Sequence, residues 1–154
     1  MKKTLLTSLL SLTLASSLMG YDAAKAESYN AFYSNMTQKV CASSKLFISA
    51  EDTMKLIQED KKYLLVDVRT KGEASVFKFS DAKALLIPIE NLFEKKNLDK
   101  LPTDIPVIMV CHSGTRGTMA AVGLKQIGFK NIQVLKGGFM ALAKANTPAA
   151  APQK

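Results

Sequence analysis

The sequence predicts an α/β fold in which a central parallel sheet is flanked by helices. Apolar runs of four to six residues alternate with segments of helical periodicity, and short buried strands between helices are typical of a parallel sheet. The 154 residues, 47% of them apolar, suffice for one compact domain and exclude a wholly disordered chain. Two cysteines are too few for a disulfide scaffold, and two Cys with one His exclude most structural zinc sites.

The chain opens with a pattern that is typical of a secretory signal peptide. Residues 1–3 are basic after the initiator Met, and residues 4–19 are uncharged and rich in Leu, Ser and Thr. This run is shorter than the ~20 apolar residues that a spanning helix needs. Residues 24–26, Ala-Lys-Ala, supply a small-x-small cleavage site. We therefore expect removal of residues 1–26, a periplasmic protein, and no stable membrane insertion after cleavage; an uncleaved anchor is the alternative.

Residues 27–46 are predicted to form an amphipathic helix outside the core. Apolar side chains recur at three- and four-residue spacing from Tyr29 to Val40, and Ser28 is the expected N-cap. The sequence leaves open whether this helix pairs two subunits in a homodimer.

Residues 47–146 are predicted to form the α/β domain, and residues 147–154, rich in Pro and Ala, a disordered tail. Ile48 lies on a short leading strand, and Ser49 opens a helix with a pattern like a capping box. Proline and glycine then separate the remaining elements. We expect buried strands at 63–68, 84–88, 106–110 and 132–135, and helices at 89–98, at 119–127 and from 139 onward.

The segment 111–117, Cys-His-Ser-Gly-Thr-Arg-Gly, joins the third of these strands to the next helix. Ligands of open α/β sheets bind beyond the carboxyl ends of the strands. Backbone N–H groups at a helix N-terminus favour a thiolate at Cys111, and Gly114 and Gly117 let the loop curl around an anion. Arg116 adds a forked positive charge that suits an oxyanion, although it could instead tie the loop to a carboxylate. The pattern indicates an anion-binding loop around a nucleophilic sulfur.

The other candidate residues support this loop. We expect His112, Ser113 and Thr115 to belong to the substrate-binding loop, with the His112 side chain facing solvent, because a cysteine ionised by amides needs no general base. Asp67 and Arg69 follow a buried strand and are expected to pair and brace the loop.

Three ordered motifs resemble those of the rhodanese family of sulfurtransferases. Residues 65–69, Leu-Val-Asp-Val-Arg, with Glu73 soon after, look like the first family motif; Cys-x4-Arg at 111–116 looks like the active loop; and 135–138, Leu-Lys-Gly-Gly, looks like the last. Residues 128–131 are also similar to the family's usual link before the final strand. The resemblance implies a rhodanese-like three-layer domain.

The resemblance also implies an activity in which Cys111 accepts a sulfane sulfur as a persulfide and passes it to a thiophilic acceptor. Four residues separate Cys111 from Arg116, one fewer than in the related phosphatases, which favours sulfur transfer over phosphate ester hydrolysis. No metal or organic cofactor is expected. Two positions depart from the family: 79–88 lacks most of the usual Gly-His-Ile-Pro-Gly-Ala, and Leu142 stands where Trp is common.

Charge and export narrow the expected partners. The 21 Lys and Arg exceed the 13 Asp and Glu by a net +8, which suits small sulfur anions such as thiosulfate or polysulfide. The positive residues are scattered and two of them are Arg, so nucleic-acid binding is not indicated. Lys136 could line the mouth of the site or lie on the plain surface. Export together with the N-terminal helix resembles the periplasmic polysulfide-sulfur transferase branch, with a thiol or a protein as sulfur acceptor.

Two other functional classes stay open. A non-catalytic module could hold sulfur for delivery to a membrane respiratory enzyme, and a redox-regulatory protein could cycle a disulfide between Cys41 and Cys111. Cys41 could also resolve a persulfide, bridge two subunits or be inert.

Overall fold

The computed structural model describes residues 20–146, and the chain divides into two units, Met1–Ser44 and Lys45–Lys154. The apolar run at 4–19 and the tail at 147–154 therefore lie outside the described residues. In the first unit, the prediction of one helix capped by Ser28 is wrong. Two helices form instead, α1 (Ala23–Tyr33) and α2 (Gln38–Ser43), and none of their side chains is buried.

Local capping explains where these two helices begin. The Asp22 carboxylate accepts a hydrogen bond from the Lys25 N–H at 3.0 Å, so α1 starts before Ser28 and includes the expected cleavage site. The Thr37 hydroxyl accepts from the Val40 N–H at 3.3 Å and starts α2 as a separate helix. Capping side chains compete with helix continuation, and this competition divides the predicted helix.

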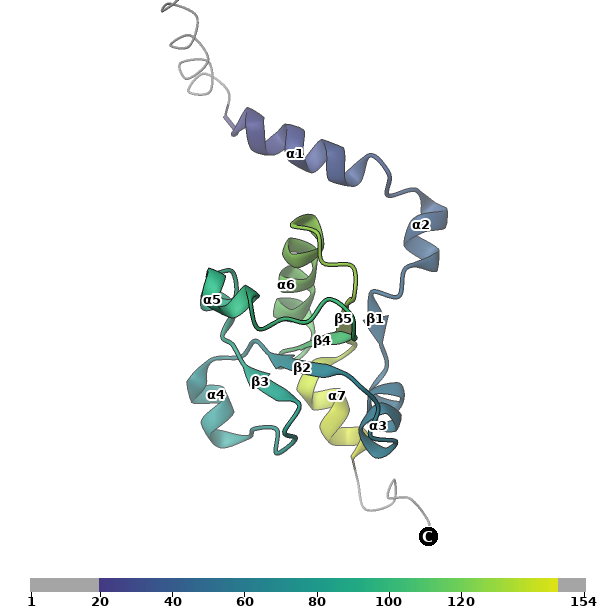
Figure 1. Cartoon of the computed structure of the whole chain (residues 1–154), viewed down its shortest axis with the longest axis vertical. Coiled ribbons are helices and arrows are strands. Elements are labelled where there is room, and N and C mark those ends of the chain that lie inside the picture. Colours follow the sequence, from purple (N-terminus) through teal and green to yellow (C-terminus); the bar gives the residue numbers. More distant parts are fainter. Residues whose placement is uncertain (1–19, 147–154) are drawn as a thin grey trace, which may run out of the picture. The chain divides into compact units, whose positions relative to one another are not determined.

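The second unit is built on a five-stranded parallel sheet of order β1-β5-β4-β2-β3, which confirms the predicted fold class (Figure 1). Every connection from one strand to the next passes through at least one helix, as the crossovers of a parallel sheet require. The strands are β1 (Phe47–Ile48), β2 (Leu64–Asp67), β3 (Ala84–Leu86), β4 (Val107–Val110) and β5 (Ile132–Leu135).

Helices cover both faces of this sheet and complete three layers. Figure 1 shows α5 and α6 on one side of the sheet and α3 and α7 on the other. Within residues 20–146, no helix is both long enough and apolar enough to cross a membrane. The helices are α3 (Ala50–Gln58), α4 (Lys71–Val76), the 3-10 turn η2 (Ile89–Asn91), α5 (Lys95–Leu98), α6 (Thr115–Gln126) and α7 (Gly138–Ala145).

The central strand β4 shows why its sequence is a continuous apolar run. Val107 and Met109 pack into the same core cluster as Leu124 of α6, while Ile108 packs on the opposite face in the cluster that contains Leu142 of α7. Because both faces are covered, all four β4 residues are fully buried. The strand therefore provides a rigid base for the residue that follows it.

Three elements differ from the prediction. The β3 strand is an edge strand and is only partly buried, with Leu86 44% exposed. The expected helix at 89–98 is divided into η2 and α5, and the Asn97 side chain donates to the Asn91 carbonyl at 2.8 Å where the first piece ends. The helix α4 was not predicted, although Thr70 and Glu73 form a complete capping box at its start.

Candidate active site

The candidate nucleophile Cys111 lies at the carboxyl end of β4, between the ends of β2 and β5. Its residue surface is 1% exposed, and the Gly114 N–H donates to its Sγ at 3.1 Å. An N–H donor of this kind stabilises negative charge on the sulfur. Gly114 adopts a φ of 106°, which is the left-handed conformation that glycine accepts most readily. The loop thus turns a backbone donor toward the sulfur within three residues.

The helix α6 starts at Thr115, four residues before the expected start at 119, so Arg116 and Gly117 lie in its first turn and not in the loop. No side chain caps this N-terminus. The first N–H groups of a helix lack intrahelical partners and carry the positive end of the helix dipole, so an anion beside Cys111 is stabilised there. A Cβ on Gly117 would lie 3.3 Å from the Met109 carbonyl oxygen, so this glycine lets α6 pack closely on β4.

The first turn of α7 holds the cysteine loop from the other side. The Phe139 N–H donates to the Cys111 carbonyl at 2.7 Å, and the Met140 N–H donates to the His112 carbonyl at 3.2 Å. Gly138 makes this approach possible, because its φ is 62° and a Cβ there would lie 2.7 Å from the His112 carbonyl oxygen and still closer to that of Cys111. Two otherwise unpaired N–H groups of the α7 N-terminus are therefore used to fix the loop.

Asp67 and Arg69 form the expected pair at the end of β2. Both residues are 3% exposed, and the Arg69 side chain donates to the Asp67 carboxylate through Nε at 2.9 Å and through Nη2 at 2.7 Å. Arg69 Nη2 also donates to the Phe77 carbonyl at 2.7 Å, and its guanidinium lies 4.3 Å from the centre of the Phe139 ring. The pair therefore joins the sheet to the C-terminal end of α4 and to the start of α7.

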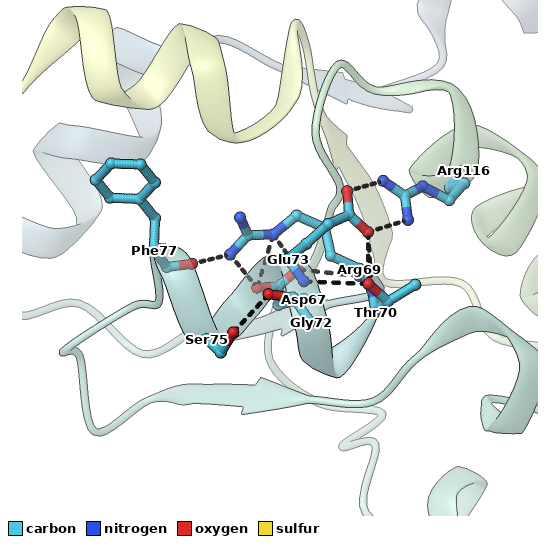
Figure 2. Close-up of polar contacts among 8 residues, drawn as sticks. All are labelled: Asp67, Arg69, Thr70, Gly72, Glu73, Ser75, Phe77 and Arg116. Carbon is cyan, nitrogen blue, oxygen red and sulfur yellow. Dashed lines mark hydrogen bonds and ion pairs between the residues drawn. The ribbon is translucent and has the colours of Figure 1, made fainter.

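Figure 2 shows Glu73 extending from α4 toward Arg116. The Arg116 guanidinium donates to both carboxylate oxygens, through Nη2 to Oε1 at 2.6 Å and through Nη1 to Oε2 at 2.7 Å. The Thr70 N–H and hydroxyl each donate to Oε2 at 3.0 Å, so the carboxylate is also held in position by hydrogen bonds other than those from Arg116. The structure therefore shows the tie to a carboxylate, one of the two roles considered for Arg116, and the anion-binding role stays a prediction.

The charges of this pair are mutually stabilised. Arg116 lowers the pKa of Glu73 far below its usual range, with a further lowering from the Thr70 N–H. In turn, the hydrogen bonds that Arg116 donates to Glu73 raise the pKa of Arg116, with smaller contributions from the neighbouring Cys111 sulfur. Both groups therefore remain charged at every pH at which the protein would work.

The remaining loop residues lie around this arrangement. His112 is exposed, as expected for a side chain that does not act as the base, and Ser113 and Thr115 are exposed beside it. Lys136 is also exposed. Cys41 and Cys111 are both free thiols. Among residues 20–146, no three His, Cys, Asp or Glu side chains gather in a way that could hold a metal ion.

Two contributions to the site were missed by sequence reasoning. Glu73 was noted as part of a motif but not as the partner of Arg116, and Gly138 was noted as the end of the 135–138 motif but not as a point of close approach to the loop. The Thr-x-x-Glu spacing at 70–73 was a usable signal for a helix start.

The fold and this geometry define a class of parallel α/β domains that place a buried cysteine at the carboxyl edge of the sheet, beside a helix N-terminus. The Rhodanese-like domain family matches residues 49–145, more than half of the chain, and the chain belongs to this family. Its site therefore lies within the matched segment.

Relatives and solved structures agree with this assignment. The chain is 32% identical over 109 residues to a sulfurtransferase from Allochromatium vinosum, a match that covers 69% of this chain and 95% of the relative. It is 32% identical over 92 residues to the probable adenylyltransferase/sulfurtransferase MoeZ of Mycobacterium tuberculosis, covering 60% of this chain but 23% of that protein. The crystal structure of a rhodanese-related protein from Thermoplasma volcanium superposes with a TM-score of 0.55 at 30% identity, covering 66% of this chain and 94% of that one.

Proposed function

We propose that the protein is an exported sulfurtransferase that moves a sulfane sulfur from thiosulfate or polysulfide to a thiophilic acceptor through a persulfide on Cys111. The observation that carries this proposal is the Gly114 N–H that points at the Cys111 sulfur, at the carboxyl edge of the sheet and at the N-terminus of α6. A relative that is matched over nearly its full length is named a sulfurtransferase, which supports the same activity here.

The first half-reaction is a displacement at sulfur. The Cys111 thiolate attacks the outer sulfur of thiosulfate, a new S–S bond forms to Sγ, and the bond to the sulfonate sulfur breaks, with its electron pair leaving as sulfite. With polysulfide, the leaving group is the polysulfide shortened by one sulfur. Charge that gathers on Sγ and on the new outer sulfur is stabilised by the loop N–H groups and the helix dipole.

The second half-reaction returns the enzyme to its starting state. A thiophile attacks the outer sulfur of the Cys111 persulfide, and the electron pair of the breaking S–S bond returns to Sγ as the thiolate. With cyanide the product is thiocyanate, and with a thiol it is a new persulfide on that thiol. Because one covalent intermediate links two half-reactions, the kinetics are ping-pong.

Steady-state kinetics test the proposal. Residues 27–154 would be assayed for thiocyanate formation from thiosulfate or polysulfide with cyanide. We expect parallel lines in double-reciprocal plots, no turnover in Cys111→Ser, and full turnover in Cys41→Ser, because Cys41 is exposed on α2. Undiminished turnover in Cys111→Ser would refute the mechanism. A stable persulfide with negligible turnover would favour sulfur delivery, and loss of turnover in Cys41→Ser would favour the redox alternative.

Export is the second part of this proposal, with the periplasm as the destination. It is supported by the basic start and by the uncharged run at 4–19 that precedes Ala-Lys-Ala at 24–26. Expression of the full chain in a bacterium, followed by fractionation and N-terminal sequencing, should give a periplasmic protein that begins at Glu27. Recovery of the uncleaved chain from the cytoplasm or the membrane would contradict export.

A further inference from the structure

The pairing of Arg116 with Glu73 has a consequence for the donors that the site accepts. An anion-binding loop is expected to offer a net positive charge, yet the guanidinium here already faces a carboxylate through two hydrogen bonds of 2.6 and 2.7 Å. Glu73 uses two of the five N–H donors of Arg116, so three remain for an anion. The guanidinium can still donate hydrogen bonds, but the pair has no net charge.

The carboxylate is held in this position by its own helix. Glu73 and Thr70 form the capping box of α4, and Thr70 follows directly on the buried Asp67–Arg69 pair. Arg69 also binds the Phe77 carbonyl at the C-cap of α4, so both ends of the helix are fixed to β2 (Figure 2). Glu73 cannot leave Arg116 when an anion arrives without disturbing that helix.

We propose that Glu73 is a specificity-determining residue, which neutralises Arg116 beside the Cys111 loop and thereby disfavours donors with two negative charges relative to persulfide donors with one. This inference rests on the proposed sulfur transfer. Thiosulfate is a dianion whose sulfonate lies beyond the transferred sulfur, whereas a small alkyl persulfide carries one charge and an uncharged alkyl group. The structure therefore assigns to the site a preference set by the charge of the leaving group.

The expected size follows from Coulomb's law. We take a separation of roughly 6 Å and an effective dielectric between those of water and of a protein surface. One carboxylate then lowers the rate constant for a donor about tenfold for each unit of negative charge on that donor, and salt reduces this effect to roughly fivefold. Removal of the Glu73 charge should therefore raise kcat/KM for thiosulfate roughly fivefold relative to kcat/KM for an alkyl persulfide. A loss of stability affects both donors alike and cancels in the ratio.

Glu73→Gln is the informative variant, because glutamine retains the capping box with Thr70 and removes the charge. Glu59→Gln is the matched control: Glu59 is exposed at the C-cap of α3, which precedes β2, and so lies at the amino edge of the sheet, away from Cys111. Both variants change the net charge by the same amount. We expect the donor ratio to rise in Glu73→Gln and to stay at the wild-type value in Glu59→Gln.

A second measurement does not require sulfur transfer. Iodoacetate and iodoacetamide differ by one negative charge, and mass spectrometry of peptides gives their alkylation rates at Cys111 and, as an internal reference, at the exposed Cys41. In Glu73→Gln, the iodoacetate-to-iodoacetamide rate ratio should rise roughly fivefold at Cys111 and stay constant at Cys41. Glu73→Ala is a second variant that removes the same charge, and it should shift the ratio in the same direction.

The two measurements separate the possible failures. An unchanged or lowered rate ratio at Cys111 in the folded variants would overturn the role of Glu73, whatever the enzyme does. A raised alkylation ratio in a protein that transfers no sulfur would support the charge effect of Glu73 and overturn the proposed function. A raised alkylation ratio with an unchanged donor ratio would overturn the specificity role.

Discussion

Gly138 is the position where a single methyl group should disturb the site most, and the change can be worked out from the structure. In Gly138→Ala, the new Cβ would lie 2.7 Å from the carbonyl carbon and oxygen of His112, and the residue would keep a φ of 62°. The left-handed conformation costs about 1 kcal/mol or more for a residue with a side chain. The neighbours are backbone atoms, so the loop or α7 must move.

Movement of α7 away from the loop weakens the hydrogen bonds from Phe139 and Met140 to the two loop carbonyls, each worth about 1 kcal/mol. Together these contributions predict a loss of about 3 kcal/mol in the free energy of unfolding, which corresponds to a fall of roughly 15 °C in Tm for a domain of this size. A displaced Cys111 should also slow persulfide formation at least about tenfold, because small misplacements of reacting groups are costly.

Urea denaturation followed by circular dichroism measures this loss, with Gly72→Ala as the control. A Cβ on Gly72 would meet only the Thr70 hydroxyl oxygen at 3.8 Å, and its φ is not positive, so we expect this helix substitution to be neutral or to stabilise by up to about 1 kcal/mol. A Gly138→Ala protein within about 1 kcal/mol of the wild type would refute the argument that α7 and the cysteine loop require glycine at their contact.

Two further predictions concern the ion pairs. Asp67→Asn should lower the free energy of unfolding by about 3 kcal/mol in urea titrations, because it leaves the buried Arg69 charge uncompensated. The control Asp99→Asn removes a carboxylate from an exposed ion pair and should lower the free energy of unfolding by no more than about 0.5 kcal/mol. Equal losses in the two variants would contradict the role of burial. Arg116 depresses the pKa of Glu73 in the folded state, so the stabilisation it gives is complete above the ordinary Glu value of 4.5 and is lost as the pH falls below it. The difference in unfolding free energy between wild type and Glu73→Gln should therefore be about 1 kcal/mol at pH 6 and shrink toward pH 3. A difference that grows on acidification would contradict a lowered pKa of Glu73 in the folded state.

The central part of the fold could be predicted from the sequence because its residues face protein on both sides. The run at 107–110 is apolar without interruption, and a strand with two covered faces needs such a run. The exposure of Leu86 could not be predicted in the same way, because an edge strand and a central strand of similar composition differ in their neighbours and not in their own sequence. Likewise, the division of the first helix depends on capping by Asp22 and Thr37, whose side chains compete locally with the apolar periodicity.

The site was predictable where its chemistry is local. The spacing of Cys111, Gly114 and Arg116 within one loop and helix start indicates an anion-binding turn, and the N–H to Sγ contact agrees with it. The partner of Arg116 lies 43 residues earlier on another helix, and its position depends on how α4 is fixed to β2. Sequence spacing alone does not show that α4 brings Glu73 next to Arg116, so the sequence could not identify Glu73 as the partner of Arg116.

The persulfide on Cys111 is the central claim, and intact mass spectrometry tests it most directly. Purified residues 27–154 would be incubated with thiosulfate or polysulfide and then separated from the unreacted donor. Their intact mass would be measured without reductant, alongside that of the Cys111→Ser and Cys41→Ser variants. The account predicts a gain of about 32 Da, one sulfur atom, in the wild type and in Cys41→Ser, none in Cys111→Ser, and loss of the added mass on treatment with cyanide. A wild-type protein that gains no sulfur, or a Cys111→Ser protein that gains as much, would contradict it.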